Sequence, residues 1–299
     1  MVELDGQSLE PLIATFSYVQ IREYASVAAF VYLVLDFFQT LESEVRYIWS
    51  GRLNGVKILF FGVRYLPLLN LPLLLVLEHG PETRPERCKG LYGLFLFLVV
   101  LSIAFGDAIA YLRVHALRLE KRSRWFTAYL SVHFTALYLL ITATFFLDLI
   151  GKIVFTPSPF PDKVQCYLEP NDGPVPMAIP FILLLCNINF ICTICKILIF
   201  RNYRNCSGPL VAIFHLDGSM GLLIMTLSTS ANLAFLLKGP PEYRFLLLPA
   251  HQAIHSTLAS RILLRMREAV YRRAESTLDP NYMRSALVFA PRPTTIATA

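Results

Sequence analysis

The stretch Leu91-Tyr-Gly-Leu-Phe-Leu-Phe-Leu-Val-Val-Leu-Ser-Ile-Ala-Phe-Gly-Asp107-Ala-Ile-Ala-Tyr-Leu112 is apolar along almost its whole length. A helix needs about 20 such residues to cross the hydrocarbon core of a bilayer, which is about 30 Å thick. Lipid offers no partners to backbone N–H and C=O groups, so a run of this kind must satisfy them within itself. The stretch therefore predicts a transmembrane α-helix.

Six further stretches have the same character, so the sequence predicts an all-α integral membrane protein with a bundle of seven transmembrane helices. The last of the seven is the least apolar, and its neighbours are the reason to count it. The predicted spans are about 24–41, 56–77, 91–112, 125–150, 175–200, 210–237 and 245–264.

Composition agrees with this assignment. Of the 299 residues 55% are hydrophobic and only 16% are charged, and the mean hydropathy is +0.53. The net charge of +6 comes from basic residues in particular loops and near the C-terminus, without interleaved aromatic residues. This pattern favours lipid headgroups over nucleic acid as the partner.

Lysine and arginine are about twice as frequent in the first, third and fifth connections and the tail as on the other side. The positive-inside rule therefore predicts residues 1–23 outside the cell and residues 265–299 in the cytoplasm. The expected location is the plasma membrane. Residues just after 264 are predicted either to lie along the inner leaflet or to form a simple helical end, and the Pro- and Thr-containing tail is predicted to be disordered.

Two of the six cysteines fall on the predicted outer, oxidising side. Cys88 precedes the third span and Cys166 lies in the fourth connection. We expect a disulfide between them, which would tie this loop across the mouth of the bundle; two unpaired thiols are the alternative. A cysteine at the outer end of the third helix paired with the second outer loop resembles the arrangement in G-protein-coupled receptors.

Polar groups inside predicted spans are costly and usually face the bundle interior. They can contact a ligand, or they can hold neighbouring helices together, as Arg64 would by pairing with Asp36 or with Asp107. No cofactor is expected. The candidate ligand-binding residues are Asp107, Asn187, Asp217, His251 and His255.

His251 and His255 are four residues apart and share one face of the seventh helix, a spacing that can seat a metal ion. Several seven-span membrane hydrolases hold zinc with such a pair and an aspartate. The second span has no Ser-x-x-x-His partner, so we expect no catalytic residues and no metal, with a zinc hydrolase as the alternative. A retinal protein is not predicted, because the seventh span has no lysine.

The segment around Glu44-Val-Arg-Tyr-Ile-Trp49 and Arg64-Tyr-Leu-Pro67 resembles the N-terminal signature of a large basidiomycete fungal family of seven-span membrane proteins with a domain of unknown function. The resemblance implies the fold and a fungal source, but it implies no reaction. The signature residues in this sequence are Asp36, Leu41, Glu44, Val45, Ile48, Trp49, Arg64, Tyr65 and Pro67.

Together these features predict a receptor-like bundle that binds a small ligand in its outer half and signals to a cytoplasmic partner through its basic inner face. The third span ends in Tyr111-Leu-Arg113-Val-His115 in place of Asp-Arg-Tyr, so the sequence predicts no particular coupling to G proteins. The alternatives are an intramembrane zinc-dependent hydrolase and a structural or scaffolding membrane protein.

Overall fold

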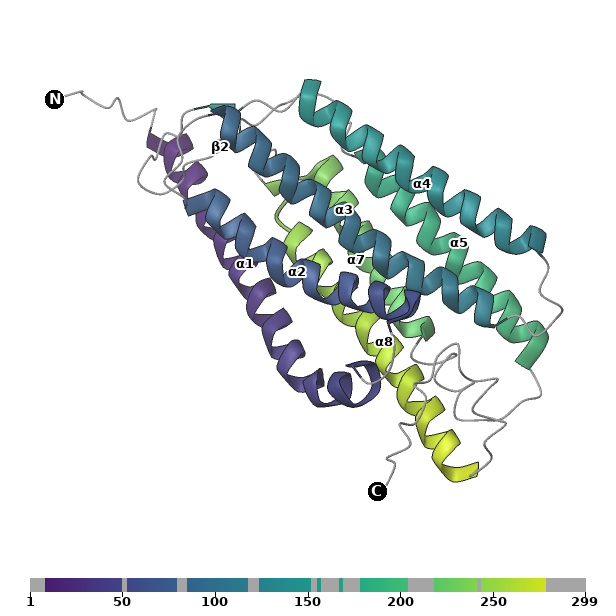
Figure 1. Ribbon diagram of the computed structural model, residues 1–299. Coiled ribbons are helices and arrows are strands. Elements are labelled where there is room, and N and C mark those ends of the chain that lie inside the picture. Colours follow the sequence, from purple (N-terminus) through teal and green to yellow (C-terminus); the bar gives the residue numbers. More distant parts are fainter. Residues whose placement is uncertain are drawn as a thin grey trace.

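The computed structural model describes residues 9–49, 53–79, 85–117, 124–151, 155–156, 167–168, 178–203, 218–240 and 243–277. Over these residues the chain forms long helices and one very short β-pair (Figure 1). The elements are α1 (Leu9–Glu44), η1 (Val45–Trp49), α2 (Gly55–His79), α3 (Pro85–Ala116), α4 (Arg124–Gly151), β1 (Phe155–Thr156), β2 (Tyr167–Leu168), α5 (Ala178–Tyr203), α7 (Gly218–Lys238) and α8 (Leu248–Thr277).

Each long helix packs against the next long helix described along the chain, and α8 closes the ring by packing against α1. α3 also contacts α5 and α8, and it is the most enclosed of the six most apolar helices: 56% of its apolar window is buried, against 17% for α4. Leucine and other large apolar side chains on the outer faces, such as Leu139 and Leu147, remain exposed. This pattern, apolar on both the inside and the outside, is that of a bundle surrounded by lipid.

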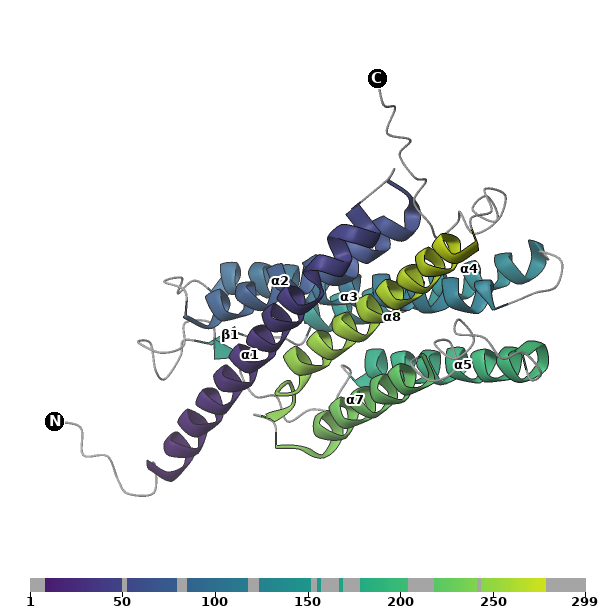
Figure 2. The same ribbon diagram turned by 90° about the horizontal axis from the view of Figure 1, so that it is seen from below.

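Six of the described helices are long and apolar enough to cross a membrane: α1 with η1, α2, α3, α4, α5 and α7. The seventh, α8, lies between α1 and α7 in Figure 2 and also packs against α2 and α3. Its arginines and histidines keep it below the apolar threshold. Four helices enclose it, and its polar side chains His251, Gln252 and His255 are buried against protein.

Several predicted boundaries differ from the observed ones. α1 begins well before residue 24 and continues through a π-helical turn to Trp49, because the charged groups after Leu41 bond inside the protein. α8 continues as one helix to Thr277 past the predicted end at 264. The start of the predicted sixth span and the C-terminal tail lie outside the described residues, and the two strands β1 and β2 were not predicted.

α2 is one continuous helix although it contains Pro67 and Pro72. Proline has no N–H, so the carbonyl four residues before it loses its helical donor. For Pro67 this carbonyl belongs to Val63, and Ser256 of α8 donates a hydrogen bond of 2.8 Å to it. The neighbouring helix thus replaces the missing donor.

Candidate functional site

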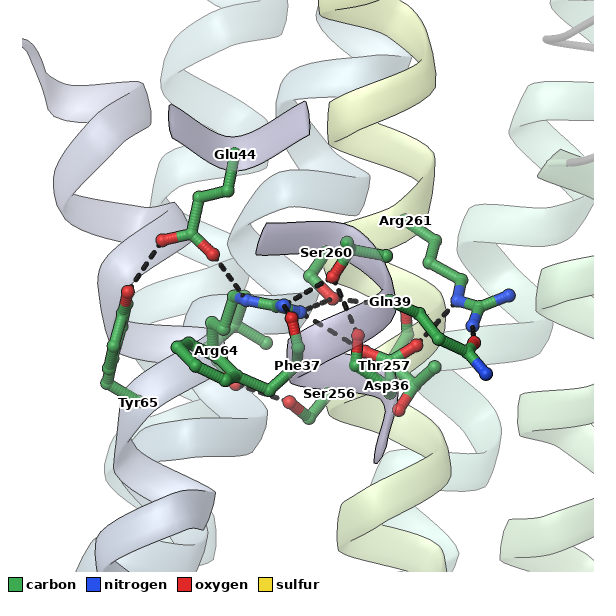
Figure 3. A network of polar contacts seen from close by, with 12 residues as sticks. Asp36, Phe37, Gln39, Glu44, Arg64, Tyr65, Ser256, Thr257, Ser260 and Arg261 are labelled. Carbon is green, nitrogen blue, oxygen red and sulfur yellow. Dashed lines mark hydrogen bonds and ion pairs between the residues drawn. The ribbon is translucent and has the colours of Figure 1, made fainter. Parts of the chain in front are cut away.

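Two buried polar networks join the helices, and both include α8. The first is centred on Arg64 of α2, which is 1% exposed. Its Nε donates to Glu44 at 2.7 Å and its Nη1 to Asp36 at 3.1 Å. The remaining guanidinium nitrogen, Nη2, donates to the carbonyl of Phe37 and to the hydroxyl of Thr40 (Figure 3). Of the two pairings that the sequence suggests for Arg64, the structure shows the one with Asp36.

Glu44, at the end of α1, is the second anchor of this network. Besides Arg64, its carboxylate accepts hydrogen bonds from Tyr65 at 2.6 Å and from the indole of Trp49 at 3.0 Å. Trp49 follows Glu44 by five residues, and the π-helical turn between them brings residues at this spacing to the same side of the helix. The carboxylate is 0% exposed, so these donors take the place of water.

Asp36 connects α8 to the first network. It accepts from Arg261 Nε at 2.6 Å as well as from Arg64, and Arg261 also donates to Gln39 at 2.9 Å. Ser260, one residue earlier on α8, lies 3.5 Å from Arg64 Nη1. Two carboxylates therefore face two guanidinium groups, and the network is neutral when all four are ionised.

The second network is centred on Asp107 of α3, which is 3% exposed. Asp107 Oδ2 accepts from Tyr138 of α4 at 2.8 Å and from Asn187 of α5 at 2.7 Å. Its other oxygen lies 3.3 Å from His255 Nε2 of α8. One carboxylate thus joins four helices.

Tyr111 extends this network by one turn of α3. Its hydroxyl donates to Asn187 Oδ1 at 2.6 Å, and it lies 2.7 Å from His133 Nδ1. Because the hydroxyl proton is already directed at Asn187, the nitrogen of His133 is the donor in the second contact. The ring of His133 also stacks on Phe190 with centroids 4.8 Å apart.

Close packing brings His255 to Asp107. A Cβ atom at Gly106 would overlap with the His255 ring, so a glycine is needed where the two helices meet. When His255 Nε2 donates to the carboxylate, Nδ1 is left as an acceptor, and among the described residues this buried nitrogen has no hydrogen-bond partner.

Of the five candidate ligand-binding residues, the structure brings together Asp107, Asn187 and His255. His251 lies one turn away on α8, with its ring 6.1 Å from that of His255, and its Nδ1 lies 2.9 Å from Ser228 of α7. Asp217 lies outside the described residues. On α3, Asp107 is closer to Ala116 than to Pro85. In the predicted orientation, this places the group below the outer half in which the sequence predicts the ligand.

Tyr111 and Tyr138 are functional candidates that the sequence did not indicate. Both were counted as part of apolar spans, although a buried tyrosine hydroxyl needs a partner. For Tyr111, the useful signal was its position: it follows Asp107 by four residues and so lies on the same face of α3. No comparable signal on α4 singled out Tyr138 from the other aromatic residues.

A small, partly open apolar groove lies apart from both networks, between α3 and α4. The groove is lined by Gly93, Leu96, Phe97, Val100, Thr142, Phe145 and Phe146.

Within the described residues, no group of three or more His, Cys, Asp or Glu side chains is arranged to hold a metal ion.

Cys88 is 2% exposed at the start of α3, and it is not one of the free cysteines of the described chain, which are Cys186, Cys192 and Cys195. Its predicted partner Cys166 lies outside the described residues, but β2 begins directly after it. β2 pairs with β1, and β1 contacts α3. The chain beside Cys166 is therefore held near α3, and the disulfide itself stays a prediction.

Comparison with known protein families gives a match to part of the chain. The family described as "Family of unknown function (DUF6533)" matches residues 24–69. This segment contains Asp36, Glu44, Arg64 and Tyr65, so the α1, η1 and α2 side of the first network lies inside the matched region. No curated protein matches the chain. The chain therefore contains a domain of unknown function within a multi-helix membrane protein.

Proposed function

We propose that this protein is a receptor-like bundle of seven membrane-spanning helices in a surface membrane. A small ligand reaches the Asp107 network from the outer side, and α8 carries the resulting change to the basic inner face. The observation that supports this proposal is the position of α8. Its His255 belongs to the Asp107 network, and its Ser260 and Arg261 belong to the Arg64 network.

The Asp107 network offers suitable chemistry for a small polar ligand. It combines one carboxylate, one amide, two tyrosine hydroxyls and a histidine nitrogen that has no partner in the described part of the chain. A ligand with a donor for His255 Nδ1, or a cationic group for Asp107, would compete with the present internal bonds. Rearranging these bonds shifts the packing of four helices at once, which is the two-state behaviour that a receptor needs.

Distance measurements between spin labels test this proposal. Labels at Trp125 and Arg272, which are 87% and 74% exposed, report on the inner ends of α4 and α8. The labels are attached to cysteines introduced at these two positions, in a variant that keeps Cys88 and Cys166 and lacks the other native cysteines. Asn187→Leu removes two bonds of the network, and we expect it to shift or broaden the distance distribution.

Asn189→Leu is the matched control, because Asn189 is exposed on the same helix and bonds only to the carbonyl of Leu185. It should leave the distribution unchanged. If Asn187→Leu behaves like this control, the network does not govern the position of α8, and a structural or scaffolding role becomes the better account.

A zinc-dependent hydrolase is the second candidate. It rests on the spacing of His251 and His255 and on the approach of His255 to Asp107 at 3.3 Å, although the three side chains are not arranged as a metal site. Metal analysis of the purified protein separates the two functions. A receptor carries no stoichiometric zinc, whereas a hydrolase carries zinc that is lost in His251→Ala and His255→Ala.

A further inference from the structure

Asn70 of α2 and Gln252 of α8 form a buried pair of side-chain amides with incomplete hydrogen bonding. Asn70 is 0% exposed and Gln252 is 1% exposed. Asn70 Nδ2 donates to Gln252 Oε1 at 3.2 Å. In the described part of the chain, neither Asn70 Oδ1 nor Gln252 Nε2 has a hydrogen-bond partner. The amide pair therefore keeps one acceptor and one donor that no described residue satisfies.

The same chemistry remains whichever way the two amide groups are turned. If both groups were turned over, Asn70 Oδ1 would accept from Gln252 Nε2, and the other two atoms would lack partners. Those two atoms are again one donor and one acceptor. If only one group were turned, two like atoms would face each other and the bond would be lost.

Buried polar atoms in native proteins almost always have a partner, which is protein, water or ligand. Asn187 of α5 shows how this bundle satisfies an amide through protein alone. Its Oδ1 accepts from Tyr111, and its Nδ2 donates to Asp107. The Asn70–Gln252 pair has no comparable neighbours among the described residues, so we expect its partner to come from outside the chain.

The amide pair lies one turn of α8 away from His255, toward the predicted outer side. α2 and α8 run antiparallel, because Val63 is bonded to Ser256 whereas Asn70, further along α2, is bonded to the earlier residue Gln252. Gln252 precedes His255 by three residues, on the side of the start of α8. The predicted orientation places this start at the outer end of the bundle.

The surroundings of the amide pair are uncharged. Leu71 and Ala253, the next residues in the two helices, are each 1% exposed and belong to one apolar cluster with Ala29 and Leu33 of α1. The two amides are neutral themselves, so an ion at this place would find no opposite charge on them. Burying an uncompensated charge is far more costly than burying a neutral polar group.

We propose that the Asn70–Gln252 pair is a binding site for a neutral group that both accepts and donates a hydrogen bond. The group accepts from Gln252 Nε2 and donates to Asn70 Oδ1. A hydroxyl, a primary amide and a water molecule share this chemistry. The site is formed by α2 and α8 alone, and it does not depend on a receptor role for the Asp107 network.

A crystal structure of the full-length protein, at a resolution that shows ordered water, gives the first test. We expect density within hydrogen-bond distance of both Asn70 Oδ1 and Gln252 Nε2. Density for a single oxygen atom assigns the site to water. Larger density assigns it to a hydroxyl or amide compound retained during purification.

Saturation-transfer NMR on the protein in nanodiscs gives the second test, with acetamide as the probe. Acetamide has both a donor and an acceptor, whereas N,N-dimethylacetamide has only an acceptor, so the wild type should bind acetamide more tightly. Gln252→Met should weaken the apparent affinity for acetamide by roughly threefold to tenfold, as expected for one lost hydrogen bond. Asn189→Leu, which removes an exposed amide of α5, is the matched control and should bind like the wild type.

Asn70→Leu carries both tests if Gln252→Met does not fold. Density for water without binding of acetamide supports the site and assigns it to water. The proposal is overturned if there is neither density at the amide pair nor binding of acetamide, or if both persist unchanged in the two variants. It is also overturned if both probes bind equally well and both depend on Gln252, because a donor on the bound group would then be unnecessary.

Discussion

The ring of His255 lies directly against Gly106, so closely that a Cβ atom at this glycine would overlap with it. This contact lets α3 and α8 approach until His255 reaches the Asp107 carboxylate. Gly106 therefore leaves space for the His255 ring, and the next residue, Asp107, is its hydrogen-bond partner.

Gly106→Ala should displace His255 and destabilise the protein. Overpacking of a filled interior costs about 1–3 kcal/mol, which outweighs the gain of up to about 1 kcal/mol from alanine in a helix. Gly90→Ala in the same helix is the control, because a Cβ there meets nothing within 4 Å. Thermal unfolding in detergent should show a lower midpoint only for Gly106→Ala; equal midpoints for the two variants would refute the close contact.

Arg64→Met should be among the most damaging single changes in the protein. It leaves Asp36 with one partner fewer and Glu44 without its guanidinium, both of them in the interior. Breaking a buried ion pair by removing one partner typically costs about 3–5 kcal/mol. Arg272→Met, which opens the exposed pair with Glu268, should change stability little.

Adding Glu44→Gln to Arg64→Met removes one of the unpaired charges, and it should recover part of the lost stability. Unfolding midpoints of the two single variants and the double variant measure this coupling. Strictly additive losses would mean that Arg64 and Glu44 do not interact as the structure shows.

Ser256→Ala should destabilise the protein by leaving the Val63 carbonyl without a donor. An unsatisfied buried acceptor costs about 1–3 kcal/mol. In a Pro67→Ala background, the residue at position 67 regains its N–H and can satisfy Val63 within α2, so Ser256→Ala should then be nearly neutral. Ser230→Ala, whose hydroxyl bonds only within its own helix, is the control. An equal effect of Ser256→Ala in both backgrounds would contradict this account.

Cys88 and Cys166 should form a disulfide in protein isolated without reducing agent. Mass spectrometry of a non-reduced digest should yield a linked peptide pair, and Cys88→Ser with Cys166→Ser should lower the unfolding temperature. Free thiols at both positions in freshly isolated protein would mean that the outer loop is held by β1 and β2 alone.

The sequence indicated the helices well and their polar contacts only in part. Long apolar runs predict membrane-spanning helices because the backbone in lipid must form its hydrogen bonds within the segment itself. The first predicted span ends at Leu41, where the apolar run stops, whereas the helix continues to Glu44 and then as η1 to Trp49. The surroundings of Glu44 and Arg46 depend on Arg64, Tyr65 and Tyr271, which approach only after folding.

The residues of the candidate site were also predicted only in part. Asp107, Asn187 and His255 stood out as polar residues within apolar runs, and the structure joins them. Tyr138 and Ser228 could not be identified in the same way, because their chemistry is common in membrane helices. Which tyrosine meets which carboxylate is decided by the rotation of each helix in the bundle, and one sequence alone does not reveal that rotation.

The seven-helix bundle depends on α8, a helix too polar to qualify as a membrane span by composition, yet enclosed by α1, α2, α3 and α7. If it crosses the membrane as the seventh helix, the two termini lie on opposite sides. An epitope tag before Met1 should be accessible on intact cells, and a tag after Ala299 only after permeabilisation. Detection of both tags on the same side would contradict the seven-helix bundle.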